Sequence, residues 1–284
     1  MSTVVLVTDA DHPELTSGDQ LYAAALAARG CEVVVGRWDD PAWRSRPFDL
    51  VVLRSPWDTW QSVEKARAFD GFLDELARLP AGAVQNDPGL LRLGEDKANL
   101  GELARTAGVH HPDTVVLGDP REAADVVAER GWADGVVKPR FGGSGWGVEL
   151  VSSGIEPVEA AGGWIVQEHL PAIVDGEIDV VVVDGAVSHA VRKVPAAGEW
   201  RTNWAFGPRW EVAEPPPVAV AAAASVIAAL PTTPLYARVD GVVQDDRFVV
   251  IEVELISPSL FLTMVPAGAD RLAEATLRRL GARD

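Results

Sequence analysis

Residues 136 to 151, VVKPRFGGSGWGVELV, place a lysine beside a glycine-rich loop that joins two β-rich runs. Lys138 follows two valines, and four glycines fall between positions 142 and 147. Glycine lets the backbone approach a ligand closely and reach positive φ, and successive exposed N–H groups form a concavity that binds anions. The stretch therefore indicates a phosphate-binding loop, and the alternative interpretation is a glycine-rich hairpin turn.

The spacing within this loop excludes two familiar phosphate-binding patterns. The P-loop requires a lysine directly after its last glycine, and no lysine follows Gly147 here. Gly143, Gly145 and Gly147 lead into a strand, whereas the dinucleotide fingerprint leads into a helix. The loop alone therefore does not decide between a phosphate site and a turn.

A second group of reactive side chains lies in LYARVDGVVQDDRFVVIEVELISP, which predicts a β-hairpin. Glu252 and Glu254 lie two apart on a strand and so point to the same face. A turn at 244 to 247 places Asp240 opposite Ile251 or Glu252, because the pairing of the strands is predicted only to within one residue. Clustered carboxylates on apolar strands are costly unless a positive group neutralises them, and Mg²⁺ is held by a few carboxylates plus substrate phosphates. The hairpin therefore suggests a metal site, and the alternative is a solvated acidic strand face.

The order of these elements resembles the ATP-grasp superfamily of carboxylate–amine ligases. A second lysine, Lys97 in EDKANL, precedes the glycine loop, and the carboxylate hairpin follows it. The resemblance runs from about Asn86 to Pro258, and the segment before it looks like the Rossmann-like α/β N-terminal domain of that family. It implies ATP and Mg²⁺ as cofactors, with Mn²⁺ as an alternative ion. It also implies an enzyme that phosphorylates a carboxylate to an acyl phosphate and joins it to an amine, releasing ADP and phosphate.

The resemblance assigns nucleotide-binding roles where residues match. Lys97 and Lys138 look like the two lysines that contact the ATP phosphates. The flexible loop that closes over the phosphates would be Gly142, Gly143, Ser144, Gly145 and Gly147. The segment VQEHL looks like the interdomain hinge, which would place Gln167, Glu168 and Leu170 at the adenine. Glu177 matches the acid that holds the ribose hydroxyls.

Catalytic and metal positions also match. Arg238, in ARVDG, matches an arginine that stabilises the transferred phosphoryl group, and the segment GEWRTNWAFG places Arg201 and Asn203 where the family holds the γ-phosphate. The expected catalytic set is Arg238, Lys138 and Arg201, and the expected metal ligands are Asp240, Glu252 and Glu254. The family most often has E-x-N where this chain has Glu252-Val-Glu254, which leaves the number of metal ions open.

The acceptor side of the site is less well matched. ISPSLFL replaces the usual glycine after the second metal strand, and this region, with Ser257 and Ser259, lies near the acceptor substrate in the family. The segment VVLRSPWDTWQ predicts a strand with Arg54, Ser55 and Asp58 at its carboxyl end. Ligands bind at this end of the strands in α/β sheets. Arg54 would hold a substrate carboxylate bidentately, and the alternative is a capped turn with a surface arginine. This stretch resembles the small ATP-grasp ligases that include the cyclo-ligase of D-cycloserine biosynthesis.

Bulk composition limits the partners. The 284 residues carry a net charge of -17, and an acidic surface disfavours nucleic acid and anionic lipid. A single cysteine, Cys31, fits a reducing compartment, and the N-terminus lacks a signal-peptide pattern. The apolar run 218 to 230 is too short to span a bilayer. We therefore expect a cytoplasmic protein with a small amino-acid or peptide substrate and no nucleic-acid or membrane partner; a homodimer is the expectation from related families.

The elements that must position these residues follow from apolar periodicity and from turn residues. Strands are expected at 3 to 8, 31 to 38, 48 to 55, 114 to 117, 135 to 140, 147 to 151 and 164 to 171, and hairpins at 177 to 194 and 235 to 258. Helices are expected at 18 to 30, 62 to 80, 121 to 131 and 218 to 230, with two short ones between 84 and 108. The first strands and helix predict a small parallel α/β layer.

These elements predict an α/β fold that becomes α+β towards the C-terminus. The N-terminal α/β domain would span 1 to 84, the lid with the glycine loop 111 to 165, and the ATP-grasp subdomain 85 to 110 together with 166 to 284. A ligase that joins two molecules is the first functional interpretation. The alternatives are an intramolecular cyclo-ligase acting on an amino-acid derivative and a non-catalytic nucleotide-binding regulatory protein.

Overall fold

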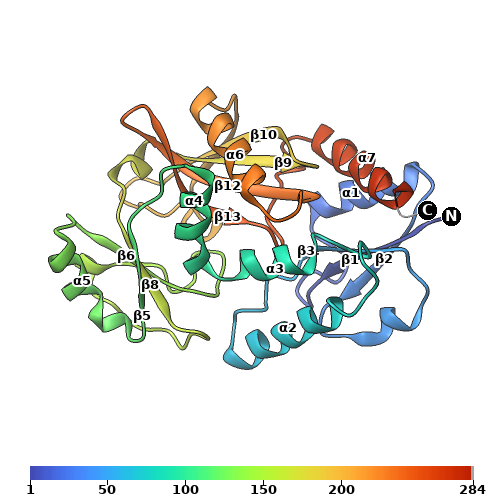
Figure 1. Cartoon of the computed structure of the whole chain (residues 1–284), viewed down its shortest axis with the longest axis horizontal. Coiled ribbons are helices and arrows are strands. Elements are labelled where there is room, and N and C mark those ends of the chain that lie inside the picture. Colours follow the sequence, from blue (N-terminus) through green and yellow to red (C-terminus); the bar gives the residue numbers. More distant parts are fainter. Residues whose placement is uncertain (283–284) are drawn as a thin grey trace.

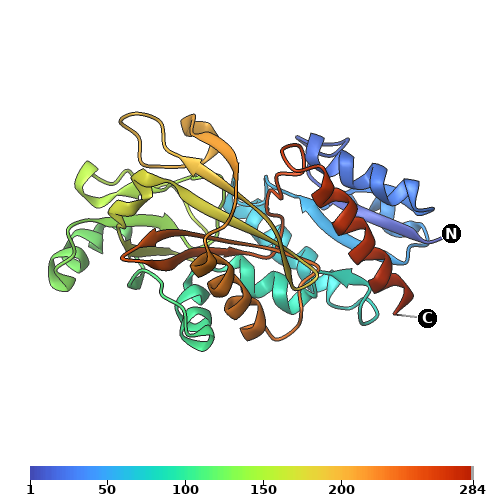
Figure 2. The same ribbon diagram turned by 90° about the horizontal axis from the view of Figure 1, so that it is seen from above.

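The fold consists of three β-sheets that follow one another along the chain. The structure, a computed structural model, describes residues 1 to 282. The sheet of the N-terminal segment and the small sheet of the middle segment lie at opposite ends of the molecule, and the larger sheet lies between them (Figure 1). The N-terminus and the last described helix of the chain both lie beside the N-terminal sheet (Figure 2). Within the described residues, the helices all fall short of the length and apolar content needed to cross a membrane.

The N-terminal sheet is parallel, with the order β2-β1-β3-β4. Its strands are β1 (Thr3–Thr8), β2 (Glu32–Arg37), β3 (Leu50–Ser55) and β4 (Val84–Gln85). Helices α1 (Ser17–Ala28) and α2 (Val63–Leu76) begin where the hydroxyls of Thr16 and Ser62 accept hydrogen bonds from first-turn N–H groups. The predicted parallel α/β layer is confirmed. The two-residue β4 was not predicted, because two residues give no periodic pattern.

The C-terminal helix α7 (Ala267–Gly281) returns to the N-terminal layer and packs against α1 (Figure 2). Tyr22 on α1 and Thr276 on α7 are fully buried, and their hydroxyl oxygens lie 2.6 Å apart. Leu272 and Leu280 contribute to the same core. The sequence analysis assigned no element to this segment, so the C-terminal cover of the N-terminal layer is a finding of the structure.

The middle sheet is antiparallel, with the order β5-β8-β6-β7. Its strands are β5 (Thr114–Leu117), β6 (Gly135–Pro139), β7 (Glu149–Leu150) and β8 (Trp164–Glu168), and α5 (Ala123–Arg130) packs on it. The glycine loop connects β6 to β7. Pairing of β8 with β6 continues to Glu168, three residues beyond the predicted end of the lid.

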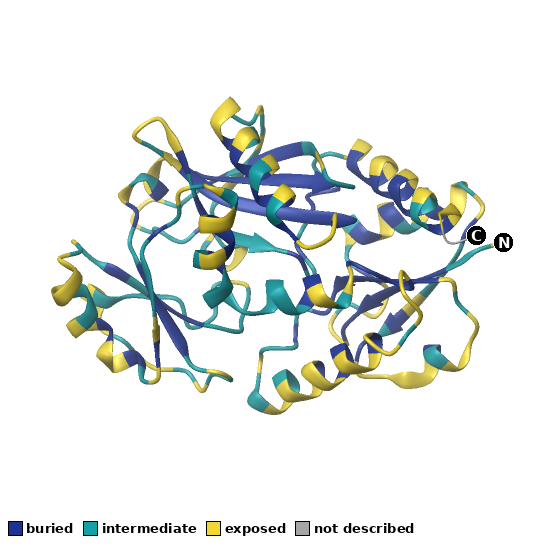
Figure 3. Ribbon diagram, viewed as in Figure 1, coloured by how far each residue is buried: buried dark blue, intermediate teal, exposed yellow. Residues whose placement is uncertain are grey.

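The large sheet has the order β11-β10-β9-β12-β13. Its strands are β9 (Glu177–Val183), β10 (Ala186–Val194), β11 (Arg209–Ala213), β12 (Tyr236–Gln244) and β13 (Arg247–Glu254). The helices α3 (Pro88–Glu95), α4 (Leu100–Ala107) and α6 (Pro217–Ala229) contribute side chains to its core. The central strand β9 is buried throughout and β12 along most of its length, whereas β11 and much of β13 are partly exposed. The helices turn their exposed faces outward (Figure 3).

Short 3-10 helices complete the described elements. They are η1 (Pro41–Ser45), η2 (Lys97–Asn99), η3 (Pro120–Glu122), η4 (Val151–Ser153), η5 (Pro171–Asp175) and η6 (Trp204–Phe206).

The predicted hairpin of β12 and β13 is confirmed, and its register decides the geometry of the site. Gln244 pairs with Arg247, and Asp240 lies opposite Glu252. The turn residues Asp245 and Asp246 both have positive φ, as a tight hairpin turn requires. The carboxylates at 240 and 252 therefore face each other across neighbouring strands, as the sequence predicted.

Asn86 connects the N-terminal layer to the large sheet. Its side-chain nitrogen donates to the carbonyls of Tyr236 and Leu255 at 2.8 and 2.7 Å. Its side-chain oxygen accepts from the N–H groups of Leu235 and Tyr236 at 2.7 and 3.3 Å. Because Asn86 is fully buried and all four of these bonds are internal, it fixes the ends of β12 and β13 relative to β4.

Candidate active site

Two adjoining cavities lie between the three sheets. The first, of about 140 Å³, runs between the middle sheet and the large sheet, and the second, of about 410 Å³, extends from there to the N-terminal layer. The residues that line both are Lys97, Gly142, Gly143, Ser144, Lys193, Thr202, Asn203, Arg238, Glu252 and Glu254. We call these residues the shared wall. It contains cations, carboxylates and part of the glycine loop, and ligands bound in the two cavities would meet at it.

Two lysines from different elements lie near Glu252 of this wall. Lys138 extends from β6 and is only 8% exposed, and burial lowers the pKa of its ammonium although nearby Glu252 opposes the shift. Lys97, from η2, lies 3.2 Å from a Glu252 oxygen and donates a hydrogen bond to the carbonyl of Gly142. A helical segment and a lid strand therefore bring two cations to one carboxylate and to the glycine loop.

Arg238 is the centre of the carboxylate hairpin. Its guanidinium donates to Asp240 at 2.8 and 2.7 Å and to Glu254 at 2.6 Å, and it lies 3.2 Å from Asp179. A further bond of 3.2 Å reaches the carbonyl of Ser259 on the side of the second cavity. One arginine therefore touches both the carboxylate cluster and the acceptor side.

The two glutamates on β13 have pKa values shifted in opposite directions. Burial alone would raise the pKa of Glu252, but Lys97 and Lys138 outweigh it and lower that pKa to about 2. Burial raises the pKa of Glu254 to about 7, although Arg238 opposes the shift. Glu252 is therefore held as an anion between two lysines, as a ligand of a cation must be.

Lys193 was missed by the sequence analysis. It projects from β10 into the shared wall, 2.8 Å from Asp179 and 3.3 Å from Glu177, and all three side chains are buried. Burial would lower the pKa of Lys193, but Asp179 and Glu177 raise it above its usual range. Folding the predicted hairpin about the turn at residues 184 and 185 brings Lys193 opposite Glu177, to within one residue. That register was the available signal.

Two groups of carboxylates have the geometry to hold a cation. One is Asp240 with Glu252 and Glu254, and the other is Asp240 with Glu177 and Asp179; within each group the oxygens lie within 4.8 Å of one another. Both groups offer only hard oxygen ligands, which Mg²⁺ and Mn²⁺ prefer. The residues present therefore fit a divalent cation at the carboxylate hairpin.

The glycine loop is held against the other elements. Ser144, Gly145 and Gly147 have positive φ, and a Cβ atom at Gly145 would lie 2.6 Å from the side-chain oxygen of Asn203. The rings of Trp146 in the loop and Trp60 in the N-terminal layer pack with centroids 5.5 Å apart. The loop therefore covers the shared wall and contacts both neighbouring layers.

Arg201 and Glu199 form an ion pair beside this loop. The guanidinium of Arg201 donates to the Glu199 carboxylate at 3.0 and 2.9 Å and to the Val148 carbonyl at 3.3 Å. Hydrogen bonds from Arg201 lower the pKa of Glu199 to about 2. Arg201 also lies over the ring of Phe206, with 3.7 Å to the centroid. Glu199 therefore positions an arginine at the edge of the first cavity.

Apolar side chains form part of the lining of the first cavity. They belong to Val136, Val148, Leu170, Ile173, Trp200 and Ile251, and Gln167 and Glu168 of β8 line the same cavity. Gln167 is buried, and its side-chain nitrogen donates to the Thr114 hydroxyl at 3.1 Å. An apolar lining with a few polar groups suits a planar heteroaromatic ring.

The structure corrects the expectation for Arg54, which is a buried structural residue. It is 1% exposed, donates to Asp19 at 2.8 Å and to the Pro258 carbonyl at 2.9 Å, and lies over the ring of Tyr236. The residues that line the two cavities do not include it. Because its guanidinium is enclosed between α1 and β12, it cannot hold a substrate carboxylate.

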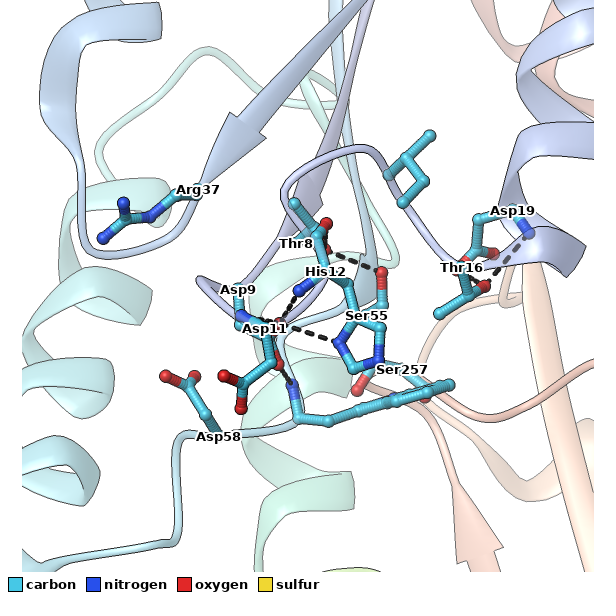
Figure 4. Close-up of polar contacts among 12 residues, drawn as sticks. Thr8, Asp9, Asp11, His12, Thr16, Asp19, Arg37, Ser55, Asp58 and Ser257 are labelled. Carbon is cyan, nitrogen blue, oxygen red and sulfur yellow. Dashed lines mark hydrogen bonds and ion pairs between the residues drawn. The ribbon is translucent and has the colours of Figure 1, made fainter.

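Ser55 and Asp58 are also turned away from the second cavity. Ser55 is buried with its hydroxyl 2.9 Å from that of Thr8 (Figure 4). Asp58 is buried and accepts from the Trp38 ring nitrogen at 2.7 Å and from Lys65 at 2.6 Å. Both therefore stabilise the loops after β1 and β3. In contrast, Ser257 and Ser259 line the second cavity, together with Trp57 and Trp60.

Comparison with known proteins agrees with this fold. The ATP-grasp domain of prokaryotic glutathione synthetase, as a family model, matches residues 106–265, and the N-terminal domain of D-cycloserine synthetase DcsG matches residues 4–85. The chain therefore belongs to the ATP-grasp ligases, a family of enzymes that form carbon–nitrogen bonds. Membership favours the catalytic interpretation over the regulatory one.

Individual relatives differ in how much of the chain they share. The cycloserine biosynthesis protein DcsG of Streptomyces lavendulae is 32% identical, and the match covers 99% of each chain. A crystal structure of D-cycloserine synthetase DcsG has a TM-score of 0.83 at 29% identity, covering 98% of this chain and 100% of the other. A glutathione synthetase of Ralstonia nicotianae is 28% identical over 73% of this chain, and the match spans only 58% of that protein.

Proposed function

We propose that this protein uses Mg·ATP to phosphorylate the carboxylate of a small molecule or peptide and then joins the acyl group to an amine. The observation that supports this most is the shared wall, because it places cations, carboxylates and a glycine loop between two cavities. Phosphoryl transfer requires positioning and charge neutralisation more than a protein nucleophile. A carboxylate oxygen would attack the γ-phosphorus as ADP leaves, and the amine would then attack the carbonyl carbon as phosphate leaves.

The first cavity would hold the nucleotide. The apolar part of the lining, with Glu168 and Leu170, would take the adenine, and Glu177 would accept from the ribose hydroxyls. The phosphates would lie against Lys97, Lys138 and the N–H groups of the glycine loop, with Arg201 and Asn203 at the γ-phosphate. These positions are supported by the lining of the cavity, in which all of these residues appear.

Asp240, Glu252 and Glu254 would hold Mg²⁺, with Mn²⁺ as the alternative. When bound, the ion neutralises charge on the nucleotide phosphates. Arg238 would stabilise the phosphoryl group during transfer, because it contacts Asp240 on one side and the Ser259 carbonyl on the other. The covering loop would exclude water and so protect the acyl phosphate from hydrolysis.

The first test separates binding from turnover. A thermal melt with Mg²⁺ and the non-hydrolysable analogue AMP-PNP should show stabilisation of about 2.7 kcal/mol at a hundred times the dissociation constant. Excess chelator should remove most of this effect. ADP release is then measured with a panel of amino acids and peptides, alone and in pairs. A protein that shows no magnesium-dependent shift lacks the proposed nucleotide site.

An intramolecular ligase is the second candidate, and the match to DcsG over the whole chain favours it. The second cavity could enclose both ends of one small molecule. The product distinguishes the two candidates. Ring closure gives one product that is lighter than one substrate by a water, whereas ligation of two molecules gives a product with the mass of both less one water.

The cytoplasmic location and the homodimer remain predictions from the sequence. Size measurement of the purified protein tests the dimer directly.

A further inference from the structure

Glu95 is an unpaired carboxylate in the second cavity. It is the last residue of α3, is partly buried, and lines this cavity together with two other carboxylates, Glu252 and Glu254. Glu252 pairs with Lys97, and Glu254 pairs with Arg238. Among residues 1 to 282, Glu95 has no hydrogen-bond or ion-pair partner. It is therefore the one carboxylate of this lining that has no direct partner within the described protein.

Aromatic rings line the same cavity as Glu95. Trp57, Trp60 and Phe69 line it from the loop after β3 and from α2. Aromatic faces attract cations, so rings and a free carboxylate in one cavity favour a positively charged ligand. The nearby Arg92 does not fulfil this role, because it is bound to Asp70 and Asp74 at 2.5 Å each.

The protonation of Glu95 agrees with this geometry. Burial raises the pKa of Glu95 to about 7, with a further rise from Asp70, while Arg92 opposes the shift. An ionised carboxylate in this place is costly without a counter-charge. A bound cation would supply that counter-charge and favour the ionised form.

We propose that Glu95 binds the primary ammonium group of the substrate whose carboxylate is phosphorylated. The inference rests on the proposed function and specifies the substrate class: a zwitterionic amino acid or short peptide with a free amino group. Its carboxylate lies at the shared wall near Arg238 and Lys97, and its ammonium lies at Glu95. This ammonium is a recognition group and is distinct from the amine that attacks the acyl phosphate.

The pH dependence of substrate binding follows from this role. Glu95 attracts an ammonium only when it is ionised, so substrate affinity should rise as pH increases from about 6 to about 8. The charged groups around Glu95 are Asp70 on α2, Arg92 on α3 and Asp96 after α3. The other charged groups of the cavity are Lys97, Lys193, Arg238, Glu252 and Glu254.

The experiment measures binding without turnover. Wild-type protein saturated with Mg·AMP-PNP is titrated with D- and L-alanine, D- and L-serine, and alanyl dipeptides, each beside its N-acetylated form. We expect an amine-bearing compound to bind at least tenfold more tightly than its N-acetyl form. Glu95→Gln should weaken that compound at least tenfold and remove its pH dependence, with nucleotide affinity unchanged within twofold.

Two further variants keep the test decisive. Glu95→Asp retains a carboxylate and should bind the amine-bearing compound more tightly than Glu95→Gln does. If Glu95→Gln folds poorly, Glu95→Asp is compared with the wild type and should still prefer the amine over its N-acetyl form. Glu102→Gln is the matched control, because Glu102 is an exposed carboxylate on α4 outside the cavity lining, and it should change amine affinity by less than threefold.

Several results would overturn the inference. They are equal affinity of wild type and Glu95→Gln, equal affinity for amine and N-acetyl forms, or no binding of any panel member to protein that binds Mg·AMP-PNP. The last result leaves the proposed ligase intact with a substrate of another class. If Mg·AMP-PNP itself does not bind, the proposed function fails first, and the inference fails with it.

Discussion

The two cavities of this site are built in different ways. The first is lined largely by strands of the middle and large sheets and by the glycine loop, and most of its charged side chains pair with one another. The second is closed by loops that follow β3 and β13 and by the end of α3, and it contains the unpaired Glu95. This difference suggests that regular elements carry the transfer chemistry and that irregular segments carry the choice of substrate.

The largest expected effect lies in the carboxylate hairpin. Asp240→Asn and Glu252→Gln should each lower kcat about 100-fold or more, because each removes a ligand from the proposed metal site at the transferring phosphoryl group. ADP release at saturating substrate measures the effect, and a thermal melt checks the fold. Asp245 is an exposed residue in the turn of the same hairpin, and Asp245→Asn is the control, which should leave kcat unchanged. Near wild-type turnover in either site variant would remove the metal assignment.

Arg54 provides a test from the other region. Arg54→Met should lower the free energy of unfolding by about 3–5 kcal/mol, because it leaves the carboxylate of Asp19 buried without its partner. Urea unfolding measures the change, and Arg54→Met combined with Asp19→Leu should regain much of it. The opposite pattern, little loss of stability with a greatly raised KM for the carboxylate substrate, would restore Arg54 to the acceptor site.

A smaller effect is expected where the two regions touch. Trp60→Ala removes the ring that packs on Trp146 of the glycine loop, and an aromatic pair contributes about 0.5–1.5 kcal/mol beyond area burial. We therefore expect the affinity for Mg·AMP-PNP to fall about threefold to tenfold, and ADP release without amine to rise as the loop closes less well. Trp60→Phe keeps a ring and should lie between. Unchanged affinity in Trp60→Ala would show that the loop does not depend on this contact.

The smallest effect concerns Glu199 and its pH dependence. Its folded-state pKa of about 2 lies below the ordinary value for glutamate, so its ion pair with Arg201 contributes stability above about pH 4.5. That contribution is lost as pH falls towards 2. Because the pair is partly exposed, we expect Glu199→Gln to cost only about 1 kcal/mol at pH 7. The free energies of unfolding of both proteins, measured between pH 7 and 2, should approach each other at the acid end; a constant gap would contradict the pair.

Much of the transfer side could be predicted from the sequence, because local rules fix it. The period of two in β13 and the turn at residues 244 to 247 place Asp240 opposite Glu252. The same reasoning about the turn after β9 would have found Lys193. The roles of these residues as metal and phosphate ligands remain predictions, whereas their proximity is a feature of the structure.

The acceptor side could not be predicted in this way, because contacts between distant segments decide it. Arg54 lies at the carboxyl end of a parallel strand, where ligands often bind, yet Asp19, Tyr236 and Pro258 enclose it. In the sequence, nothing distinguishes Glu95 from other carboxylates on helices. Only the folded structure places it in the second cavity. The packing of α7 on α1 likewise depends on a return of the chain that no local pattern indicates.

The central claim is that a carboxylate in the second cavity receives the γ-phosphoryl group of ATP in the first. The most direct measurement uses a substrate that supports ADP release, prepared with ¹⁸O in its carboxylate, and follows the label by mass spectrometry of the released phosphate. Transfer through an acyl phosphate predicts one ¹⁸O atom in each phosphate and ADP as the nucleotide product. Phosphate without label, or AMP in place of ADP, would contradict the account.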